Sequence, residues 1–365
     1  MEHPTLRSTD FFEAFEPTAP LRIARDRRTA RHAQAVAPPE LDAALIARFE
    51  RALVETVTGL LEPGDSPVAE HVAWHFGIGC DDGAQRGKRL RPRMLLHVAL
   101  DEGGSFDGAL DAALAVELLH NYSLVHDDIE DGDTSRRGRQ TVWARYGLSH
   151  GINAGDAICA VSYLTLLRNS GCSPPERLMA TARVLQRANL AMCAGQAHDL
   201  DFETAAEVSL ETYVAMIDGK TAALFGAACE LGALCAGCDP IRTAAYAELG
   251  RAYGRAFQIR DDVLGVSSDI ARRKWSFPIA WALAGPPSAA RSTIATRYAR
   301  SSPLDRQDVD AIAEALDALG ARRAAETAAL EHFGEASRLA QRYRLDRAGT
   351  VRALFALDHS SKAIA

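Results

Sequence analysis

The stretch ELDAALIARFERALVETVTGLLE, residues 40–62, carries its apolar side chains along one helical stripe. Successive members of the stripe are three or four residues apart, so in an α-helix they share a single face. Such a face is stable only when it packs against another element. The stretch therefore predicts an amphipathic helix that packs within a larger helical assembly. The stripe consists of Leu41, Leu45, Phe49, Leu53, Val57 and Leu60.

The chain on the C-terminal side of this stretch keeps the helical pattern. Alanine and leucine dominate, and no run alternates polar and apolar residues as a half-buried strand would. No linker rich in glycine or serine divides the pattern, so we expect one all-α domain, residues 39–365, after an irregular arm, residues 1–38. The other expected helices cover 66–77, 90–101, 107–131, 139–146, 153–168, 175–202, 208–219, 221–237, 240–266, 275–284, 288–301, 305–319 and 321–343.

Composition limits the classes of function. The 365 residues carry a net charge of −7, which disfavours nucleic acid as a partner, and 47% of them are apolar, which excludes wholesale disorder. No stretch reaches the roughly 18 apolar residues that a membrane span needs. The N-terminus contains acids and prolines where a signal peptide has an apolar core. We expect a cytoplasmic protein without stable membrane insertion, and a solvated basic arm.

Cysteine spacing offers one candidate metal or redox motif, Cys235 and Cys238 in LCAGCDP. A second pair with metal spacing is missing from the sequence, and Gly237 is a typical helix stop. We therefore interpret the motif as a helix end. Gly195, Gly219 and Gly320 are further candidate stops or bends.

Two acidic clusters stand out. In the first, DDIED, Asp127 and Asp131 are four residues apart and lie on one helix face, where like charges repel. Carboxylates at a helix C-terminus also oppose the helix dipole, so the cluster is either hydrated or neutralised by a cation such as Mg²⁺.

The second cluster, FQIRDDVLG, places Asp261 and Asp262 in an apolar helix, three and four residues after Gln258. Buried aspartates are costly unless they are paired, here with Arg255 or Arg260, or bound to a metal ion. Two such clusters on long helices favour a pair of facing helices that hold several Mg²⁺ ions and grip a diphosphate.

Basic residues gather in RGKRLRP, residues 86–92, and in SRRGRQTVW, residues 135–143. Each cluster could be a solvated loop, but guanidinium groups match phosphate oxygens in pairs. Basic and acidic clusters together suggest two anionic groups, one held through metal and one held directly. His120, two turns before Asp127, and Lys220-Thr221, at an expected helix break, are either members of this site or ordinary structural residues.

Together these motifs resemble the trans-isoprenyl diphosphate synthases, the polyprenyl synthetase family. The resemblance covers roughly residues 40–345 and keeps the order of the family's motifs. It implies an all-helical bundle around a deep central cavity, usually as a homodimer. The motifs are GKRLRP, HNYSLVHDDIEDGDTSRRG, GINAGDA, GQAHDLDFE, GKTAALFGAACELGA and FQIRDDVLG.

The resemblance also implies Mg²⁺ as the cofactor, about three ions per active site, and two kinds of substrate. The metal ligands would be Asp127, Asp128, Asp131 and Asp261, with Asp262 beside them. The allylic diphosphate would contact Arg136, Lys220 and Lys274. Isopentenyl diphosphate would bind to Lys88, Arg91, His120 and Arg137. Thr221 and Gln258 would lie beside the developing carbocation, and Gln196 and Asp199 would support the metal site from behind.

The sequence departs from the family pattern at two places. Gly265 stands where the second acidic motif usually has a third aspartate, and Asp269 is a candidate replacement. The link between Val266 and Lys274 is shorter than the loop that the family leads us to expect.

Product length depends in this family on residues just before the first aspartate motif. Tyr122, five residues before Asp127, resembles the floor residue of geranylgeranyl diphosphate synthases, with farnesyl diphosphate as the second candidate product. Two other functions remain open. A terpene cyclase of the same fold would not need the second basic site, and a non-catalytic partner subunit would tolerate the degraded motif.

Overall fold

The structure is a computed structural model that describes residues 39–60, 66–80, 87–168, 174–205, 207–300, 302–347 and 349–354. The expected arm, residues 1–38, and Arg86 lie outside the described residues. The boundary between arm and domain therefore stays a prediction.

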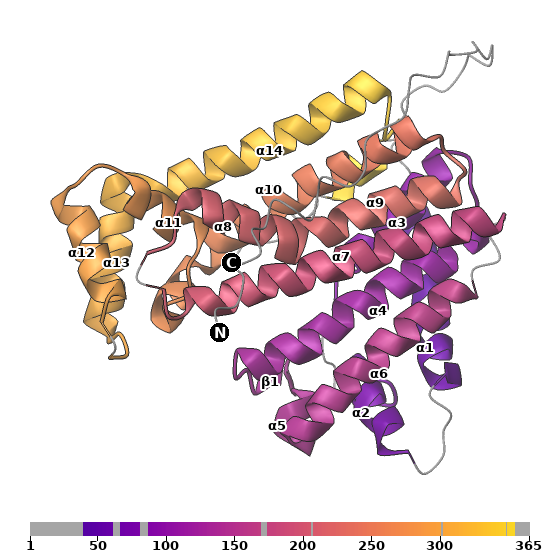
Figure 1. The fold of residues 1–365 in the computed structure, drawn as a ribbon, viewed down its shortest axis with the longest axis horizontal. Helices are drawn as coiled ribbons and strands as arrows, with labels where there is room; N and C mark the ends of the chain where they lie inside the picture. Colours follow the sequence, from indigo (N-terminus) through magenta and orange to yellow (C-terminus); the bar gives the residue numbers. More distant parts are fainter. Residues whose placement is uncertain are drawn as a thin grey trace, which may run out of the picture. The chain divides into compact units, whose positions relative to one another are not determined.

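Within these ranges the chain is almost entirely helical (Figure 1). The one ladder of strands there joins β1 (Ser135–Arg136) to β2 (Arg139–Gln140) in antiparallel register. An all-α fold was predicted, and the structure confirms it. The helices are α1 (Pro39–Leu60), α2 (Pro67–Phe76), α3 (Leu90–Asp101), α4 (Phe106–Glu130), α5 (Val142–Tyr146), α6 (Leu148–Leu167), α7 (Pro175–Phe202), α8 (Leu210–Ile217), the π-helical turn η1 (Asp218–Ala222), α9 (Ala223–Cys235), α10 (Pro240–Arg272), α11 (Phe277–Ala284), α12 (Ala289–Tyr298), α13 (Arg306–Leu319) and α14 (Ala321–Tyr343).

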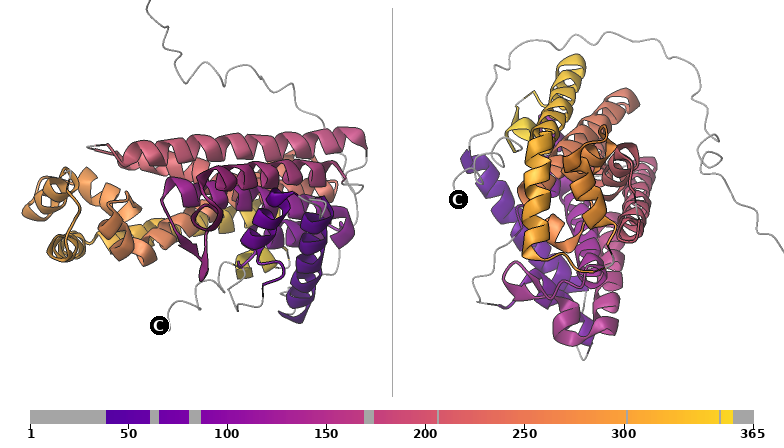
Figure 2. Two further views of the ribbon diagram at one scale, coloured as in Figure 1. Left: turned by 90° about the horizontal axis from the view of Figure 1, so that it is seen from below. Right: turned by 90° about the vertical axis from the view of Figure 1, so that its left-hand side faces the viewer.

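Helix α4 lies at the centre of the bundle. Ser105 caps its N-terminus by accepting a hydrogen bond from the backbone of Gly108. Its middle, from Ala112 to Leu119, is buried on every side, which is the pattern of a helix surrounded by others. Figures 1 and 2 show α4 alongside α6 and α7, and it also contacts α3 and α9.

Three clusters of buried apolar side chains hold the helices together. The first surrounds α4 and includes residues of α1, α3, α6, α7 and α9. The second joins α8 and the end of α10 to α11, α13 and the start of α14. The third lies between α3, α9, α10 and the residues after α14. The long helices α9 and α10 therefore connect the regions that carry the predicted motifs.

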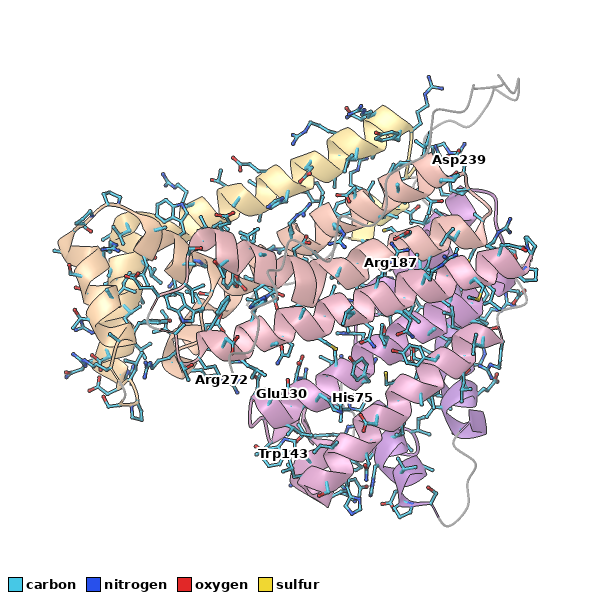
Figure 3. The ribbon with its side chains drawn as sticks, viewed as in Figure 1. His75, Glu130, Trp143, Arg187, Asp239 and Arg272 are labelled. Atoms are coloured by element: carbon cyan, nitrogen blue, oxygen red, sulfur yellow. The ribbon has the colours of Figure 1, made fainter. Side chains whose placement is uncertain are left out.

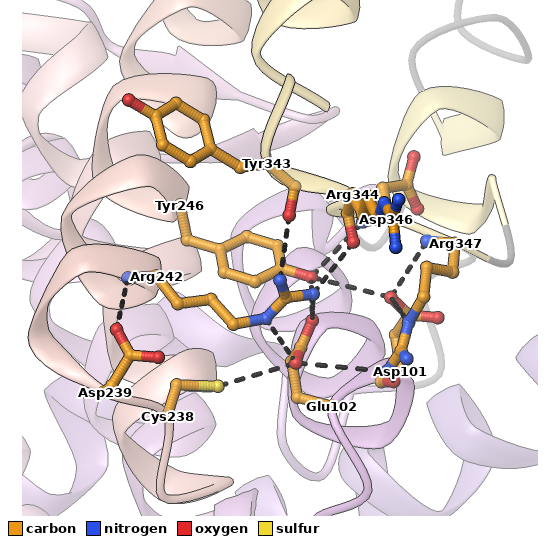
Figure 4. Close-up of polar contacts among 10 residues, drawn as sticks. All are labelled: Asp101, Glu102, Cys238, Asp239, Arg242, Tyr246, Tyr343, Arg344, Asp346 and Arg347. Atoms are coloured by element: carbon orange, nitrogen blue, oxygen red, sulfur yellow. Dashed lines mark hydrogen bonds and ion pairs between the residues drawn. The ribbon is translucent and has the colours of Figure 1, made fainter. Parts of the chain in front are cut away.

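A polar network fastens the C-terminal end of α14 to the end of α3 (Figure 4). The Arg242 guanidinium pairs with the Glu102 carboxylate and also donates to the backbone oxygens of Tyr343 and Arg344, at 2.8 Å each. Tyr246 donates to Glu102 at 2.7 Å. The buried Glu102 carboxylate, at the end of α3, is thus joined to α10, more than a hundred positions later in the sequence.

The expected end of the helix that begins at residue 240 is wrong. Helix α10 continues to Arg272, because Val266 and Ile270 are four residues apart and both are buried in the second apolar cluster. The helix ends at Arg273, which adopts a left-handed conformation with φ of 57°. The segment interpreted as a short loop is therefore two additional helical turns.

Other boundaries also differ from expectation. Residues 139–140 form a strand and not a helix, and α6 begins at Leu148 and not at 153. Gly195 lies inside α7, and the expected break at Lys220 is the continuous π-helical turn η1. The interpretation of Cys235 and Cys238 is confirmed: α9 ends there, and Gly237 is left-handed with φ of 78°.

Among the helices of the described ranges, none combines the length and the apolar character that crossing a bilayer demands.

Candidate active site

The three aspartates at the end of α4 point to different partners. Asp128 is buried and accepts a hydrogen bond from Arg136 Nε at 2.6 Å. Asp131 pairs with Lys274 at 2.6 Å. Burial raises the pKa of Asp127 to about 6, with Lys220 opposing the shift and Asp131 adding to it. Asp127 and Asp131 therefore share one lysine-lined region, and Asp128 is engaged by the hairpin.

The π-helical turn η1 presents Lys220 to this region. Lys220 Nζ lies 2.5 Å from Asp199 of α7. Burial lowers the pKa of Lys220, but the charges of Asp199 and Asp127 outweigh that effect, so the net shift is upward. Lys220 is therefore a fully charged ammonium between α4 and α7.

Close contact between α7 and η1 fixes the position of this lysine. A Cβ built on Gly195 would lie 2.2 Å from the backbone nitrogen of Lys220, so only glycine fits there. Gln196, the next residue, donates to Glu130 of α4 at 2.7 Å. The predicted supporting residues Gln196 and Asp199 thus contact the acidic end of α4 and Lys220, respectively.

The aspartates of the second cluster have separate environments. Asp262 is buried and accepts three hydrogen bonds, from Tyr213 (2.5 Å), Gln258 (2.9 Å) and the backbone of Phe277 (2.9 Å). Burial raises its pKa to about 7 despite these bonds. With its oxygens occupied by protein donors, Asp262 supports the site from behind. Asp261 lies on the exposed side of α10.

Gln258 connects Asp262 to Thr221. The Thr221 hydroxyl donates to Gln258 Oε1 at 2.7 Å. The predicted pair Thr221 and Gln258 therefore belongs to one hydrogen-bonded row that runs from η1 to α10.

Asp269 fills the place that Gly265 leaves open. A Cβ built on Gly265 would lie 3.4 Å from Asp269 Oδ2, so the carboxylate of Asp269 lies over the glycine. Burial raises the pKa of Asp269 to about 6, with Lys274 opposing the shift and Asp261 adding to it. The extension of α10 thus returns a carboxylate to the second cluster.

The two acidic clusters face the same region. Lys274 pairs with Asp131 of the first cluster and acts electrostatically on Asp269 of the second. Arg272, at the end of α10, pairs with Asp133 just beyond α4. Figure 3 shows Arg272 close to Glu130, the last residue of α4.

The basic residues form a neighbouring cluster. Arg91 lies 3.2 Å from His120 Nε2, and its own Nε has no hydrogen-bond partner. A Cβ on Gly87 would lie 2.8 Å from the Arg137 guanidinium, so the RGKRLRP segment and the hairpin pack against each other. Lys88 is exposed beside them. Arg91, His120 and Arg137 thus lie together, and Lys88 follows Gly87, against which Arg137 packs.

Two other arginines of these basic segments have structural roles. Arg89 is buried between Glu50 at 2.7 Å and Glu117 at 2.6 Å. Arg139 stacks over Trp74 and donates to the backbone of His75. The Arg89 charge is neutralised by its two glutamates, and the Arg139 guanidinium packs on Trp74.

Sequence reasoning missed His75. It hydrogen-bonds Asn121 at 3.0 Å, and Arg137 of the basic cluster acts on it electrostatically. Burial lowers its pKa to about 3, with the hydrogen bond to Asn121 opposing the shift and the charges of Arg137 and Arg136 adding to it. The signal in the sequence was one polar residue in the apolar run AWHFGI, and that pattern does not identify Asn121 as its partner.

Tyr122 is buried on α4, and its hydroxyl donates to Asn189 of α7 at 2.5 Å. The predicted floor residue therefore lies on the side of α4 that faces α7.

The donor set suits Mg²⁺ that is bound together with a phosphate ligand. In the described part of the chain, no group of three or more His, Cys, Asp or Glu side chains is arranged to hold a metal ion. Mg²⁺ typically binds one or two carboxylates and completes its shell with water and substrate phosphates. The like charges around Asp127, with its raised pKa, favour a cation there.

An all-helical bundle with two facing acidic helix segments and an adjoining basic cluster defines the class of isoprenoid synthases. The comparisons agree. A family profile described as polyprenyl synthetase matches residues 81–316, so the chain belongs to the polyprenyl synthetase family. Its activity class is that of a prenyltransferase.

Relatives within the family are similar over most of the chain. A (2E,6E)-farnesyl diphosphate synthase of Mycobacterium tuberculosis is 36% identical over 74% of this chain and 79% of its own length. A geranylgeranyl diphosphate synthase of the same organism is 32% identical over 81% of this chain and 88% of its own length. The solved polyprenyl synthetase from Streptomyces coelicolor has a TM-score of 0.77 and 28% identity, covering 87% of this chain and 97% of that one.

Proposed function

We propose that the protein condenses isopentenyl diphosphate with an allylic diphosphate, as a short-chain trans-prenyltransferase. The observation that carries the proposal is the arrangement of two anion sites side by side. One is lined by carboxylates and lysines, and the other by Arg91, His120 and Arg137. Relatives named as farnesyl and geranylgeranyl diphosphate synthases support the same substrates.

The allylic diphosphate would lie between α4 and α10. Mg²⁺ ions bound to Asp127, Asp131 and Asp261 would neutralise the diphosphate and stabilise the negative charge that develops as its C–O bond breaks. Lys220 and Lys274 already lie at this place, each paired with a carboxylate. They would exchange those partners for phosphate oxygens.

Asp128 and Arg136 act together in this proposal. The buried carboxylate orients the guanidinium through Nε, which leaves the terminal nitrogens for the diphosphate. We thus assign Asp128, predicted as a metal ligand, a positioning role.

Isopentenyl diphosphate would bind to the basic cluster. Arg91 has an unpartnered Nε, and burial lowers the pKa of His120 well below its ordinary value, with Arg91 adding to the shift. A neutral His120 can donate one hydrogen bond to phosphate while its other nitrogen faces Arg91. An added dianion would compensate the repulsion among these cations.

Carbon–carbon bond formation needs a dry, weakly polar surface beside the allylic carbon. The Thr221 and Gln258 oxygens lie there without a net charge, and their mutual hydrogen bond fixes them. They can stabilise a developing carbocation without trapping it. The proton lost afterwards can go to the released diphosphate, so no strong protein base is required.

Asp269 takes the part of the missing third aspartate in our proposal. Its carboxylate reaches back over Gly265 toward the face of Asp261. From there it can accept hydrogen bonds from water molecules around a Mg²⁺ ion bound to Asp261.

Tyr122 would end the cavity for the growing chain, which favours geranylgeranyl diphosphate as the product and farnesyl diphosphate second. We also propose that the active form is a homodimer, and the surface that supports this is described in the Discussion.

The decisive experiment is incubation of the purified chain with isopentenyl diphosphate, one allylic starter and Mg²⁺, followed by mass analysis of the products. We expect a prenyl diphosphate with 20 carbons, or with 15, and no product when EDTA is present. A hydrocarbon released from geranylgeranyl diphosphate alone would instead identify a cyclase. An inactive chain that becomes active with a partner would identify a non-catalytic subunit.

A further inference from the structure

Three polar side chains from three helices form a hydrogen-bonded row inside the bundle. Tyr122 of α4 donates to Asn189 Oδ1 at 2.5 Å, and Asn189 Nδ2 of α7 donates to the Tyr163 hydroxyl of α6 at 2.5 Å. Asn189 therefore uses both ends of its amide, one for each tyrosine. The Cys193 thiol lies beside this bond, 3.4 Å from the Tyr122 hydroxyl and 3.9 Å from Asn189 Oδ1.

Tyr122 is buried at the apolar end of this row, whereas Asn189 and Tyr163 are half-buried. Tyr122 belongs to the cluster that includes Leu119, Ile158, Leu185 and Met192. Polar groups in such an environment are stable only when they satisfy one another with well-aligned hydrogen bonds. The position of the Tyr122 ring is therefore set by the amide of a neighbouring helix as well as by its own backbone.

Tyr122 on α4 and Asn189 on α7 lie at similar distances along their helices from the acidic cluster. Tyr122 precedes Asp127 by five residues, or about 7.5 Å along α4. Asn189 precedes Gln196 by seven residues, or about 10 Å along α7, and Gln196 is bonded to Glu130 of α4. Helices α4 and α7 thus run in the same direction here. A chain extending between them from a diphosphate at Asp127 meets Tyr122 and Asn189 together.

We propose that Asn189 is a specificity-determining residue that limits product length by holding the Tyr122 ring across the path of the growing chain. The inference rests on the proposed condensation activity and deepens it. Asn189 acts through Tyr122 and is a positioning residue, since the ring itself contacts the hydrocarbon. Tyr163 accepts a hydrogen bond from the Asn189 amide and so fixes its orientation. Residues of α4, α6 and α7 therefore limit the product length together.

The test compares product distributions of variants that keep the volume of the wall. Asn189→Leu removes both hydrogen bonds while preserving a side chain of similar size. We expect the ratio of longer to normal product to rise about tenfold, the factor that corresponds to loss of one buried hydrogen bond. The rate of the first condensation and the KM for isopentenyl diphosphate should stay within about twofold, because the diphosphate sites are unchanged.

Three further single variants and one double variant separate the roles. Tyr122→Phe should lengthen products as Asn189→Leu does, and the double variant should add nothing further, because both remove the same bond. Tyr163→Phe should cause a smaller shift in the same direction. Cys193→Ala removes only the thiol contact with the Tyr122 hydroxyl and should shift the product less than Asn189→Leu does, since the bond between Tyr122 and Asn189 remains.

The outcomes distinguish the role of Asn189 from the proposed condensation activity. An unchanged product distribution in Asn189→Leu, with a normal first condensation, overturns the role of Asn189 and leaves the condensation activity standing. If Asn189→Leu is insoluble, an unchanged distribution in Tyr163→Phe together with Tyr122→Phe overturns it equally. A wild-type chain that elongates no allylic diphosphate overturns the proposed function and this inference with it.

Discussion

The neighbouring aspartates Asp261 and Asp262 on α10 differ in burial and in the hydrogen bonds that they accept. Asp262 accepts three hydrogen bonds from α8, α10 and α11, whereas Asp261 faces outward from α10. Asp262→Asn would turn an amide N–H toward at least one of these donors. We expect it to lower the free energy of unfolding by about 1–3 kcal/mol, the cost of a buried unsatisfied polar group.

Asp261→Asn is the matched variant. Because Asp261 accepts none of the three hydrogen bonds of Asp262, its loss of stability in urea should be smaller than that of Asp262→Asn. Calorimetry should show weaker Mg²⁺-dependent binding of a non-reactive diphosphate. Equal stability losses in the two variants would contradict the division of roles.

The family resemblance assigns Asp261 to a metal ion and Asp262 to a place beside it, but spacing alone does not identify the protein partners of either. The pattern DD in an apolar helix shows that the pair needs partners, not where the partners come from. Tyr213 and the backbone of Phe277 lie in other segments, and so does Arg136, which engages Asp128. Such roles depend on tertiary contacts that spacing does not encode.

His75 links stability to pH. Its pKa is about 3 in the fold and about 6.5 in an unfolded chain, so the unfolded state takes up a proton more readily. The contribution of neutral His75 to the free energy of unfolding is therefore complete above about pH 6.5 and decreases as the pH falls toward 3. Between pH 7.5 and 5.5 the loss from this group is about 1 kcal/mol.

His75→Gln keeps a donor for Asn121 and cannot take up a proton. Urea denaturation at both pH values should show a smaller loss for this variant than for wild type. The same loss in both proteins would mean that His75 is not the group responsible.

At the scale of elements, the approach of α7 to η1 determines where Lys220 lies. Gly195→Ala would place a methyl group 2.2 Å from the Lys220 nitrogen, so the two backbones must separate. We expect a loss of about 1–3 kcal/mol in stability and a large decrease in kcat, because the π-helical turn carries both Lys220 and Thr221.

Gly59→Ala in α1 is the control for this change. A Cβ there meets nothing within 4 Å, so alanine should leave activity unchanged and raise stability slightly through its helix propensity. If Gly195→Ala behaves like Gly59→Ala, the close contact does not position the lysine.

The extension of α10 supplies the next prediction. Asp269→Asn removes the charge that lies over Gly265, and we expect the Mg²⁺ concentration needed for diphosphate binding to rise about tenfold, as for other residues that orient a metal site. Ser268→Ala, one residue earlier and exposed, is the control. Titration of a non-reactive diphosphate with Mg²⁺ distinguishes this from a loss of folding. An unchanged Mg²⁺ requirement would exclude Asp269.

The bounds of α10 and of other helices show what sequence patterns can predict. Helices with a strong start and stop, such as α7 and α14, were predicted with their observed bounds. The end of α10 was not, because the expectation of a loop came from the family and not from VSSDIAR. That segment contains neither glycine nor proline, and its apolar residues keep the helical period.

At the scale of the whole helical unit, the surface of α6 and α7 is unusually apolar. These two helices carry most of the large apolar side chains exposed in the described ranges. Exposed apolar side chains concentrated on neighbouring helices mark a protein interface. They are Leu148, Ile152, Leu164, Leu167, Met179 and Leu190.

This surface supports the proposed homodimer. In a two-fold dimer each helix face meets its own copy, so one substitution enters the interface twice. Leu190 is 70% exposed at the middle of α7. Leu190→Glu would place two like charges in an apolar interface, and we expect light scattering to show a monomer where wild type is a dimer.

Ile241 is equally exposed, at 71%, but belongs to α10 and not to the α6 and α7 surface, so Ile241→Glu should remain dimeric. A monomeric wild type would exclude the homodimer, and dissociation by both variants would place the interface elsewhere. Because Asn189 is adjacent to Leu190 along α7, the row that limits product length lies directly beneath this surface. Dimer formation would then hold α7 in place from outside while Tyr122 contacts it from within.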